Sequence, residues 1–516
     1  MWKLGSRDRK VEGPDLDACV AACYVRDERT AGRQDYWRRK KKILEKRKKE
    51  QPESNASWRS KSIASGHLRQ RRMCLACEVR QAATPEDGAG PWTAGGGREA
   101  DADVPAARRK RPRARRLTDI FTSSASRRPA DIGDETRHRQ WAALLGIGTA
   151  NPANCVRQDE YADWYFNVTG SEHLTHLKTK MKRMCDKSSI HRRYFHHSES
   201  TIREHPILLG RGQPSLDARQ DELASAVPVL AAAAAEDAIA EWGRPATDIT
   251  DLVVSTYSGA HMPGADLRLA SLLGLRPSVR RTVLYLQRCT AGGAVLRVAK
   301  DIAENNPGAR VLVACAELTL FMFRAPDDAC PGTLVMQSMF ADGASAAVVG
   351  ARAEEPVELP IYEMVSASQF LIPETSDGRA AGVLNEAGLV FQPSRGIPAL
   401  VRQNIERCVA DALRLLGLGD GGGGRWNDLF WAVQPSGRAI LDAVVAELAL
   451  EADKLAASRR VLREYGYMSG ASMIFVLDEL RRRPAVELGV MLAIGPGISV
   501  ETMVLRVAGA RESSSD

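Results

Sequence analysis

A cysteine between an apolar strand and a helix is the residue of this sequence best suited to act as a nucleophile. The stretch LYLQRCTAGGAVLRVAKDIAEN (284–305) predicts a strand, then Cys289, then a turn of small residues and an amphipathic helix. A thiol at a helix N-terminus is favoured as a thiolate by the helix dipole. Small side chains at 291–293 would let a substrate carbonyl approach the backbone amides, which could stabilise an oxyanion. The alternative is a buried structural cysteine, the usual role of a lone Cys.

A second predicted strand ends at a glutamine, in a position that often holds a catalytic side chain. In FWAVQPSGRAILD (430–442) an apolar run ends at Gln434, and a turn and a helix-like segment follow. Strand ends that open onto a helix commonly hold catalytic side chains. Glutamine cannot act as a base, so Gln434 is either a surface amide or a replacement for an acid–base residue.

The elements that must position these residues begin near Trp141. From there apolar strands alternate with amphipathic helices, in two blocks of similar plan, which predicts an α/β fold with buried sheets. The expected strands are 142–148, 251–259, 282–287, 310–318, 345–351, 361–369, 428–434, 486–495 and 500–509. The expected helices are 221–242, 291–305, 397–416, 437–449 and 470–483.

The first 139 residues have a different composition from the rest of the 516-residue chain. They hold 34 Lys+Arg and 20 Asp+Glu, leaving 38 basic and 44 acidic residues of the chain's 72 and 64 for the remainder. Basic runs such as RRKRPRARR (108–116) alternate with Gly/Ala/Pro-rich pieces, so we predict a disordered basic leader. Its basic runs are typical of nuclear-localisation or nucleic-acid patches, but we favour a solvated leader, or a segment joined to the real domain in error.

The cysteines and apolar runs exclude several classes of protein. Ten cysteines show no dense disulfide framework, no apolar run matches a membrane helix, and no secretory signal is evident. We therefore expect a cytoplasmic location, no membrane span and cysteines that are thiols. The pairs Cys19/Cys23 and Cys74/Cys77 could be imagined as a zinc site, but they lack ordered context, so we predict no metal.

Several long motifs together resemble one known family. They are IGTANPANCV (147–156), RMCDKSSIHRRY (183–194), PSLDARQDE (214–222), MPGADLRLASLLGLRP (262–277), CTAGGAVLRVAKDIAENN (289–306), FADGASAAVVG (340–350), EYGYMSGAS (464–472) and GPGISVETMVL (495–505). Over 141–510 the chain resembles the plant type III polyketide synthases of the chalcone/stilbene synthase family. The resemblance implies the thiolase fold, a layered αβαβα duplication that is normally a homodimer. The expected organisation is the leader at 1–139, an N-terminal half at 140–356 and a C-terminal half at 357–510.

The resemblance also implies an activity and the residues that carry it. The family loads a CoA-linked starter on a cysteine, extends it with malonyl-CoA by decarboxylative condensation, and cyclises the product without a bound cofactor or metal. Cys289 matches the acyl-carrying nucleophile, and Phe340 and Phe391 match two gatekeeper phenylalanines between the CoA tunnel and the cavity. Lys180, Arg183 and Lys187 match the residues that bind the CoA phosphates, and their spacing puts them on one helix face.

Further positions match the substrate cavity of the family. Met262 matches a residue that reaches into the neighbouring subunit, and Ser469, Gly382 and Pro496 are retained. The cavity set as a whole is Tyr257, Met262, Thr319, Met322, Gly382, Ser469 and Pro496. Tyr257 and Met322 stand where the family usually has small hydroxyl residues, so we expect less space for a growing polyketide.

Three departures from the family fall in the catalytic motifs. Gln434 replaces the histidine of the Cys–His–Asn triad, and Tyr467 replaces the asparagine. The usual Gly-Cys-Phe reads Arg288-Cys289-Thr290. We expect Arg288 to point away from the thiol, because neighbours along a strand face opposite sides.

The departures predict a slow enzyme. A histidine partner depresses a cysteine pKa by several units, whereas a free thiol, with a pKa of about 8.5, is only a few per cent ionised at pH 7. Loss of one oxyanion donor typically costs about 10²–10³ in rate. We therefore predict an acyltransferase with slow condensation. The alternatives are a non-catalytic homologue that binds CoA esters or pairs with an active synthase, and a nucleic-acid role of the leader, which we do not favour.

Overall fold

The computed structural model describes residues 141–508, except 211–212, 331, 374, 376–380, 393–395, 415, 417–424 and 484–485. All of them fall within one structural unit, Arg127–Asp516. The predictions for the leader, including Cys19, Cys23, Cys74 and Cys77, lie outside the described residues. The six cysteines that the structure describes are free thiols, namely Cys155, Cys185, Cys289, Cys315, Cys330 and Cys408.

Nine strands form one mixed sheet in the order β11-β12-β13-β8-β1-β7-β6-β4-β5. They are β1 (Ala142–Ala150), β4 (Asp251–Thr256), β5 (Arg280–Tyr285), β6 (Arg310–Glu317), β7 (Gly343–Ala351), β8 (Tyr362–Leu371), β11 (Phe430–Val433), β12 (Leu488–Gly495) and β13 (Ser499–Val507). Two separate two-stranded antiparallel sheets accompany it, β2 (Asn154–Arg157) with β3 (Arg192–Phe195) and the hairpin of β9 (Ala381–Asn385) with β10 (Gly388–Gln392). The short antiparallel pairing of β1 with β8 joins two halves of the large sheet.

The α-helices of the described residues are α4 (Gln158–Val168), α5 (Thr175–Lys187), α6 (Glu199–Glu204), α7 (Leu216–Trp242), α8 (Ala265–Leu272), α9 (Ala291–Asn305), α10 (Gly332–Met339), α11 (Ile397–Arg414), α12 (Arg438–Glu447), α13 (Ala456–Tyr465) and α14 (Ser472–Leu480). Short 3-10 turns connect them: η2 (Pro206–Leu209), η3 (Ala246–Asp248), η4 (Arg288–Thr290), η5 (Thr319–Met322), η6 (Arg425–Asp428) and η7 (Ser469–Ala471).

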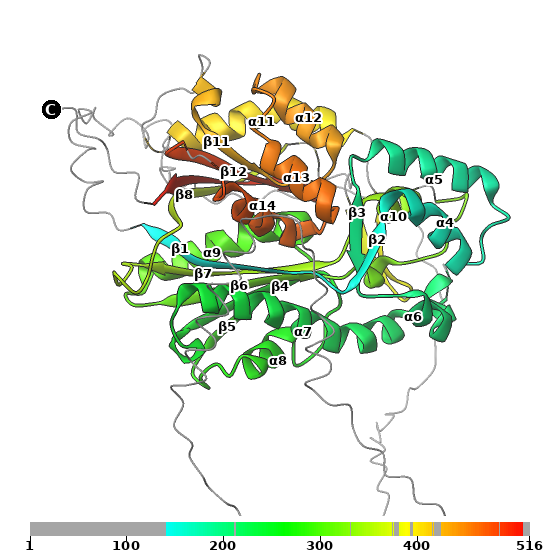
Figure 1. Cartoon of the computed structure of the whole chain (residues 1–516), viewed down its shortest axis with the longest axis horizontal. Coiled ribbons are helices and arrows are strands. Elements are labelled where there is room, and N and C mark those ends of the chain that lie inside the picture. Colours follow the sequence, from blue (N-terminus) through cyan, green and yellow to red (C-terminus); the bar gives the residue numbers. More distant parts are fainter. Residues whose placement is uncertain are drawn as a thin grey trace, which may run out of the picture. The chain divides into compact units, whose positions relative to one another are not determined.

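The elements stack in five layers, as Figure 1 shows. Helices α7 and α8 cover the outer face of the half formed by β1, β7, β6, β4 and β5. Helices α9 and α14 lie in the middle, between this half and the half formed by β8, β13, β12 and β11. Helices α11 and α12 form the outer layer on the far side. The predicted αβαβα thiolase architecture is confirmed.

Helix α7 begins five residues earlier than the sequence pattern predicts. The backbone N–H groups of Ser215 and Leu216 both donate to the carbonyl of Glu386, 2.8 Å away in each case. This distant carbonyl satisfies amides at the start of the helix, which have no partner within it. A contact of this kind is not visible in the local sequence.

Helix α7 packs closely against β1 because a glycine of the strand faces alanines of the helix. A Cβ at Gly148 would overlap the carbonyl oxygen of Ala234 and lie 2.5 Å from the nitrogen of Ala238. Among the described helices, one is long and apolar enough to cross a membrane, and it is α7. Half of its most apolar stretch, however, is buried inside the protein. Its alanines pack on β1, β6 and β7, so in this fold α7 is a core helix.

We predict that Gly148→Ala lowers the free energy of unfolding by about 3 kcal/mol or more, because the new methyl group meets backbone rather than a movable side chain. Urea denaturation followed by circular dichroism would measure it. Ala233→Ser, which adds one atom to the exposed side of α7, is the control and should change stability by less than about 0.5 kcal/mol. Equal effects of the two substitutions would contradict the close packing.

Candidate active site

Cys289 lies in η4, immediately before the central helix α9, and its exposed fraction is 8%. The chain segment across from it is the end of β12, where Gly495 permits close approach. A Cβ at Gly495 would lie 3.2 Å from the Cβ of Cys289 and 2.9 Å from the nitrogen of Thr290. The thiol therefore stands at the N-terminal end of a 15-residue helix, as predicted, in a position where the helix dipole favours negative charge.

The small residues after Cys289 serve packing rather than substrate approach. A Cβ at Gly292 would overlap the carbonyl oxygen of Gly470, and one at Gly293 would lie 2.7 Å from the Cβ of Glu501. Protein atoms fill the space that the sequence analysis assigned to a substrate carbonyl. That expectation was wrong, because both glycines face η7 and β13 and bring α9 close to them.

Gln434 follows β11 and is buried, with an exposed fraction of 1%. Its amide nitrogen Nε2 donates to the carbonyl of Cys289 and to the carbonyl of Ser469 at 3.0 Å, and lies 3.1 Å from the hydroxyl of Tyr467. Its Oε1 accepts from the backbone N–H of Ile494 at 3.1 Å. Gln434 is therefore not a surface amide. It ties together three segments of the backbone around the thiol.

Tyr467 lies next to the glutamine and lines the cavity together with Cys289. Its ring centroid lies 4.8 Å from that of Phe340. Burial raises the pKa of Tyr467 well above its ordinary value, and the adjacent Cys289 acts in the same direction. The phenol is therefore neutral at physiological pH. It can donate one hydrogen bond toward the sulfur or toward a thioester oxygen held there.

A cavity of about 560 Å³ leads to Cys289. Its inner end is formed by Cys289, Phe340 and Tyr467, and its walls are mainly apolar side chains of α10, α12 and the segment after β12. Among the described residues that line it, none is His, Asp or Glu. The cavity therefore offers a nucleophile and hydrogen-bond donors, but no general base other than the thiolate itself.

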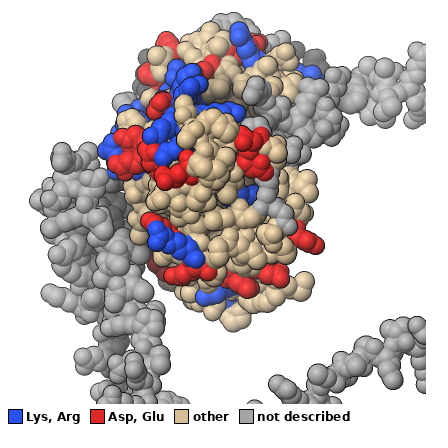
Figure 2. Space-filling model, turned by 90° about the vertical axis from the view of Figure 1, so that its right-hand side faces the viewer, with Lys and Arg blue, Asp and Glu red and all other residues tan. Residues whose placement is uncertain are grey.

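The outer end of the same cavity is cationic. Lys180, Arg183 and Lys187 of α5 line it, together with Arg438 at the start of α12. Lys178 and Lys182, on the same helix, form ion pairs with Asp163, at 2.9 and 2.8 Å. Within the described part of the chain, Lys180, Arg183 and Lys187 form no ion pair. Figure 2, which faces the side of the molecule that carries α5, shows Lys and Arg side chains gathered in its upper half.

Arg288 points into the protein beside the site, contrary to expectation. Its side chain is buried, with its guanidinium carbon 4.9 Å from the ring centroid of Tyr257 and 5.4 Å from that of Phe340. Its Nη1 lies 3.2 Å from the sulfur of Met322. The expectation assumed an extended strand, whereas Arg288 lies in a tight turn with φ of 52°. Strand alternation does not hold there.

The remaining predicted site residues fall in four groups. Pro496 lines the cavity, whereas Tyr257, Thr319, Met322 and Ser469 are buried and do not line it. Gly382 is exposed in β9, away from the cavity lining, because β9 forms a separate hairpin with β10. Met262 is 98% exposed in the loop between β4 and α8. Phe391 belongs to β10, but its side chain lies outside the described residues.

Sequence reasoning missed Arg438 and the apolar walls of the cavity. Gly437, just before Arg438, has φ of 128°, and a Cβ there would lie 2.7 Å from the Cε of Met339. The glycine thus brings the start of α12 against α10, and Arg438 to the cavity mouth. The Ser436-Gly437-Arg438 turn was the available signal, because glycine and a cation at a helix start suit an anionic ligand.

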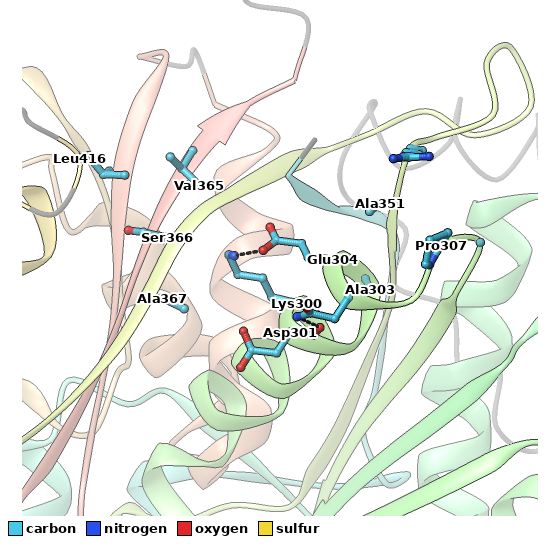
Figure 3. Close-up of a pocket in the computed structure, with 13 residues that line it drawn as sticks. Lys300, Asp301, Ala303, Glu304, Pro307, Ala351, Val365, Ser366, Ala367 and Leu416 are labelled. Atoms are coloured by element: carbon cyan, nitrogen blue, oxygen red, sulfur yellow. Dashed lines mark hydrogen bonds and ion pairs between the residues drawn. The ribbon is translucent and has the colours of Figure 1, made fainter. Parts of the chain in front are cut away.

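A second, polar cavity lies at the other end of α9, as Figure 3 shows. It has a volume of about 730 Å³ and is lined by Lys300, whose Nζ lies 2.6 Å from Oε2 of Glu304. Eleven residues of helix separate Lys300 from Cys289, which corresponds to about 16 Å along the axis. None of the predicted site residues lines this cavity.

Comparison with known proteins identifies the family. The model for chalcone and stilbene synthases, N-terminal domain, matches residues 131–353, and the model for the C-terminal domain of the same family matches 363–508. The chain belongs to the chalcone and stilbene synthase family. It is a plant type III polyketide synthase by descent, in a family of acyltransferases. A relative, bisdemethoxycurcumin synthase of Oryza sativa subsp. japonica, is 57% identical over 372 residues, which cover 70% of this chain and 92% of the relative.

We predict that Gln434→Leu lowers the free energy of unfolding of this synthase homologue by roughly 3 kcal/mol or more. The substitution leaves the N–H of Ile494 and the carbonyls of Cys289 and Ser469 buried without the amide, and each such group costs about 1–3 kcal/mol. Urea denaturation would measure the loss.

Gln220→Leu provides the matched control. The side-chain amide of Gln220 also makes two hydrogen bonds to backbone, but at an exposed site. Its Oε1 accepts from the nitrogen of Ala260 at 2.8 Å, and its Nε2 donates to the carbonyl of Ala260 at 2.6 Å. Water can replace it, so we expect a loss below about 1 kcal/mol. A loss from Gln434→Leu no larger than this control would show that Gln434 does not hold the site together.

Proposed function

We propose that the protein transfers acyl groups from CoA thioesters to Cys289 and condenses them slowly with malonyl-CoA, as a type III polyketide synthase with an altered triad. The observation that carries the proposal is that one cavity joins the cationic face of α5 to the thiol of Cys289. A CoA ester would place its phosphates at Lys180, Arg183 and Lys187 and its thioester at the inner end. No bound cofactor is part of the proposal.

The reaction has two steps. In the first, the sulfur of Cys289 attacks the thioester carbonyl and the bond from that carbonyl to the CoA sulfur breaks. The thiol proton passes to the departing CoA. In the second, malonyl-CoA loses carbon dioxide, and the remaining carbanion attacks the Cys289 thioester. A carbon–carbon bond forms, and Cys289 is released as a thiolate.

The hydrogen bonds of Gln434 support a slow second step. Its two amide hydrogens face three oxygen atoms of the protein itself, those of Cys289, Ser469 and Tyr467. Gln434 is therefore not available to hold a malonyl oxygen, and Tyr467 contributes a single neutral donor. Loss of one oxyanion donor typically costs about 10²–10³ in rate, and no histidine stands beside the thiol among the described residues that line the cavity.

A second candidate is a non-catalytic homologue that binds CoA esters or dimerises with an active synthase. The fully engaged amide of Gln434 favours it, as does the lack of His, Asp or Glu among the described lining residues. Exposed Met262, with Leu267, Leu272 and Leu286 and the edge strand β5, offers an apolar surface for a second subunit. We propose a dimer through this surface in either case, in the cytoplasm.

Activity measurements separate the two candidates. We expect Cys289 to be acylated by acyl-CoA, as seen by intact-protein mass spectrometry, and carbon dioxide release with malonyl-CoA to be at least about 100-fold slower than in an active family member. The starters are acetyl-CoA and 4-coumaroyl-CoA, and bisdemethoxycurcumin is included among the products sought because the relative is named for it. Cys289→Ala is the control for site-specific acylation. If no starter acylated Cys289, the non-catalytic candidate would be favoured. Condensation as fast as in an active family member would overturn the proposal that the altered triad slows the reaction.

The cationic end of the cavity makes a separate prediction. The double variant Lys180→Ala/Arg183→Ala should raise the acyl-CoA concentration for half-maximal acylation by about tenfold or more, because charge-assisted bonds to phosphate are lost. An N-acetylcysteamine thioester, which has no phosphates, should react equally with both proteins.

Lys182→Ala is the matched control on the same helix, because Lys182 is exposed, pairs with Asp163 and does not line the cavity. It should leave the concentration dependence within about twofold. If it weakens acyl-CoA use as much as the double variant does, α5 acts through its overall charge and not through a phosphate site.

A further inference from the structure

We propose that Arg288 is a specificity-determining residue that closes the inner side of the acyl site, so that Cys289 accepts short acyl groups and excludes bulky ones. The inference rests on the proposed function and names its substrate class. The relevant fact is where the cavity ends. Cys289, Phe340 and Tyr467 line its inner end, whereas Arg288, Tyr257 and Met322 are buried and do not line it.

Geometry connects this boundary to acyl size. A CoA ester that enters past α5 must bring its thioester carbonyl to the sulfur of Cys289 while its pantetheine arm fills the cavity. The acyl substituent then meets the inner end of the cavity, where the ring of Phe340 is backed by the guanidinium of Arg288 at 5.4 Å. The cavity has a volume of about 560 Å³, within the range of about 300–1,000 Å³ typical of a site for one small ligand, and the pantetheine arm takes up part of it.

The side chain of Arg288 is held in place by several contacts. Its guanidinium lies against the rings of Tyr257 and Phe340, and its Nη1 contacts the sulfur of Met322. Cation–π contacts of a desolvated arginine are among the stronger ones of this class. The positive charge of Arg288 also favours the ionised form of Glu317, whose pKa is raised by burial. Oε2 of Glu317 accepts a hydrogen bond from the backbone nitrogen of Tyr257 at 3.0 Å. The closure is therefore a packed cluster and not a single mobile side chain.

The backbone at Arg288 makes a clean test possible. Its φ of 52° is in the left-handed region, which glycine adopts without the cost that a side chain carries. Arg288→Gly therefore removes the closure without demanding a new backbone conformation. Met322→Ala removes a support of the guanidinium without altering a neighbour of the thiol.

The experiment compares acylation of Cys289 by acetyl-CoA, hexanoyl-CoA and 4-coumaroyl-CoA, followed by intact-protein mass spectrometry against time. For the native protein we expect acetyl transfer to exceed 4-coumaroyl transfer by at least about 100-fold. Arg288→Gly should reduce this ratio to about tenfold or less, mainly by faster 4-coumaroyl transfer, with hexanoyl-CoA intermediate. Met322→Ala should reduce the ratio severalfold, and Arg288→Lys, which keeps a long cationic chain, should keep most of it.

The outcomes are distinguishable. If 4-coumaroyl-CoA acylated the native protein as fast as acetyl-CoA does, the proposal that Arg288 closes the acyl site would be overturned. The proposed function would remain intact. Absence of acylation by all three esters, in both the native protein and Arg288→Gly, would overturn the proposed function and the closure with it. Circular dichroism and acetyl transfer report whether Arg288→Gly is folded. If it is not, Met322→Ala decides, and an unchanged ratio in that variant overturns the proposal.

Discussion

The close crossing of α9 with η7 at Gly292 and Gly470 is the contact on which the site depends. Neither glycine tolerates a Cβ, because one on Gly292 would overlap the carbonyl oxygen of Gly470 and one on Gly470 would overlap the Cβ of Ala291. The contact joins the start of α9, directly after Cys289, to η7, directly after Tyr467. Because α9 and α14 form the middle layer of the fold, both sheet halves hold this contact in place.

Close to that crossing, the side chain of Gln434 has a structural role. Gln434 fastens the carbonyls of Cys289 and Ser469 to the backbone of Ile494, and this links the central layer to β12. A buried polar network of this kind rigidifies a site when its members are satisfied. The same bonds leave the amide without a hydrogen for a substrate. Rigidity around the thiol and the slow condensation that we propose would therefore have one cause.

The sequence was sufficient for the fold class and for the position of the thiol, but not for side-chain direction. Alternating apolar strands and amphipathic helices predicted an α/β fold with buried sheets, whereas the αβαβα layers were implied by the family resemblance. A strand–turn–helix junction predicted the placement of Cys289. Arg288 was misjudged because its direction depends on a positive φ in a tight turn, which period-two alternation does not describe. Gly292 was misjudged because its partner, Gly470, is far away in the sequence. The hydrogen bonds of Gln434 were likewise not predictable, because its amide bonds backbone groups of three residues that are distant in the sequence.

The altered residues form one connected cluster, which constrains how the site could change. Gln434 bonds Tyr467, the Tyr467 ring packs on Phe340, and the Phe340 ring faces the guanidinium of Arg288, which in turn contacts Tyr257 and Met322. Substitutions in contact with one another are not additive, and coupling energies reach about 0.5–3 kcal/mol. A histidine at 434 alone would still face a bulky neutral phenol at 467 and a filled space beyond the thiol. The cysteine side and the Arg288 side of this cluster share the ring of Phe340, so a substitution on one side is coupled to the packing on the other.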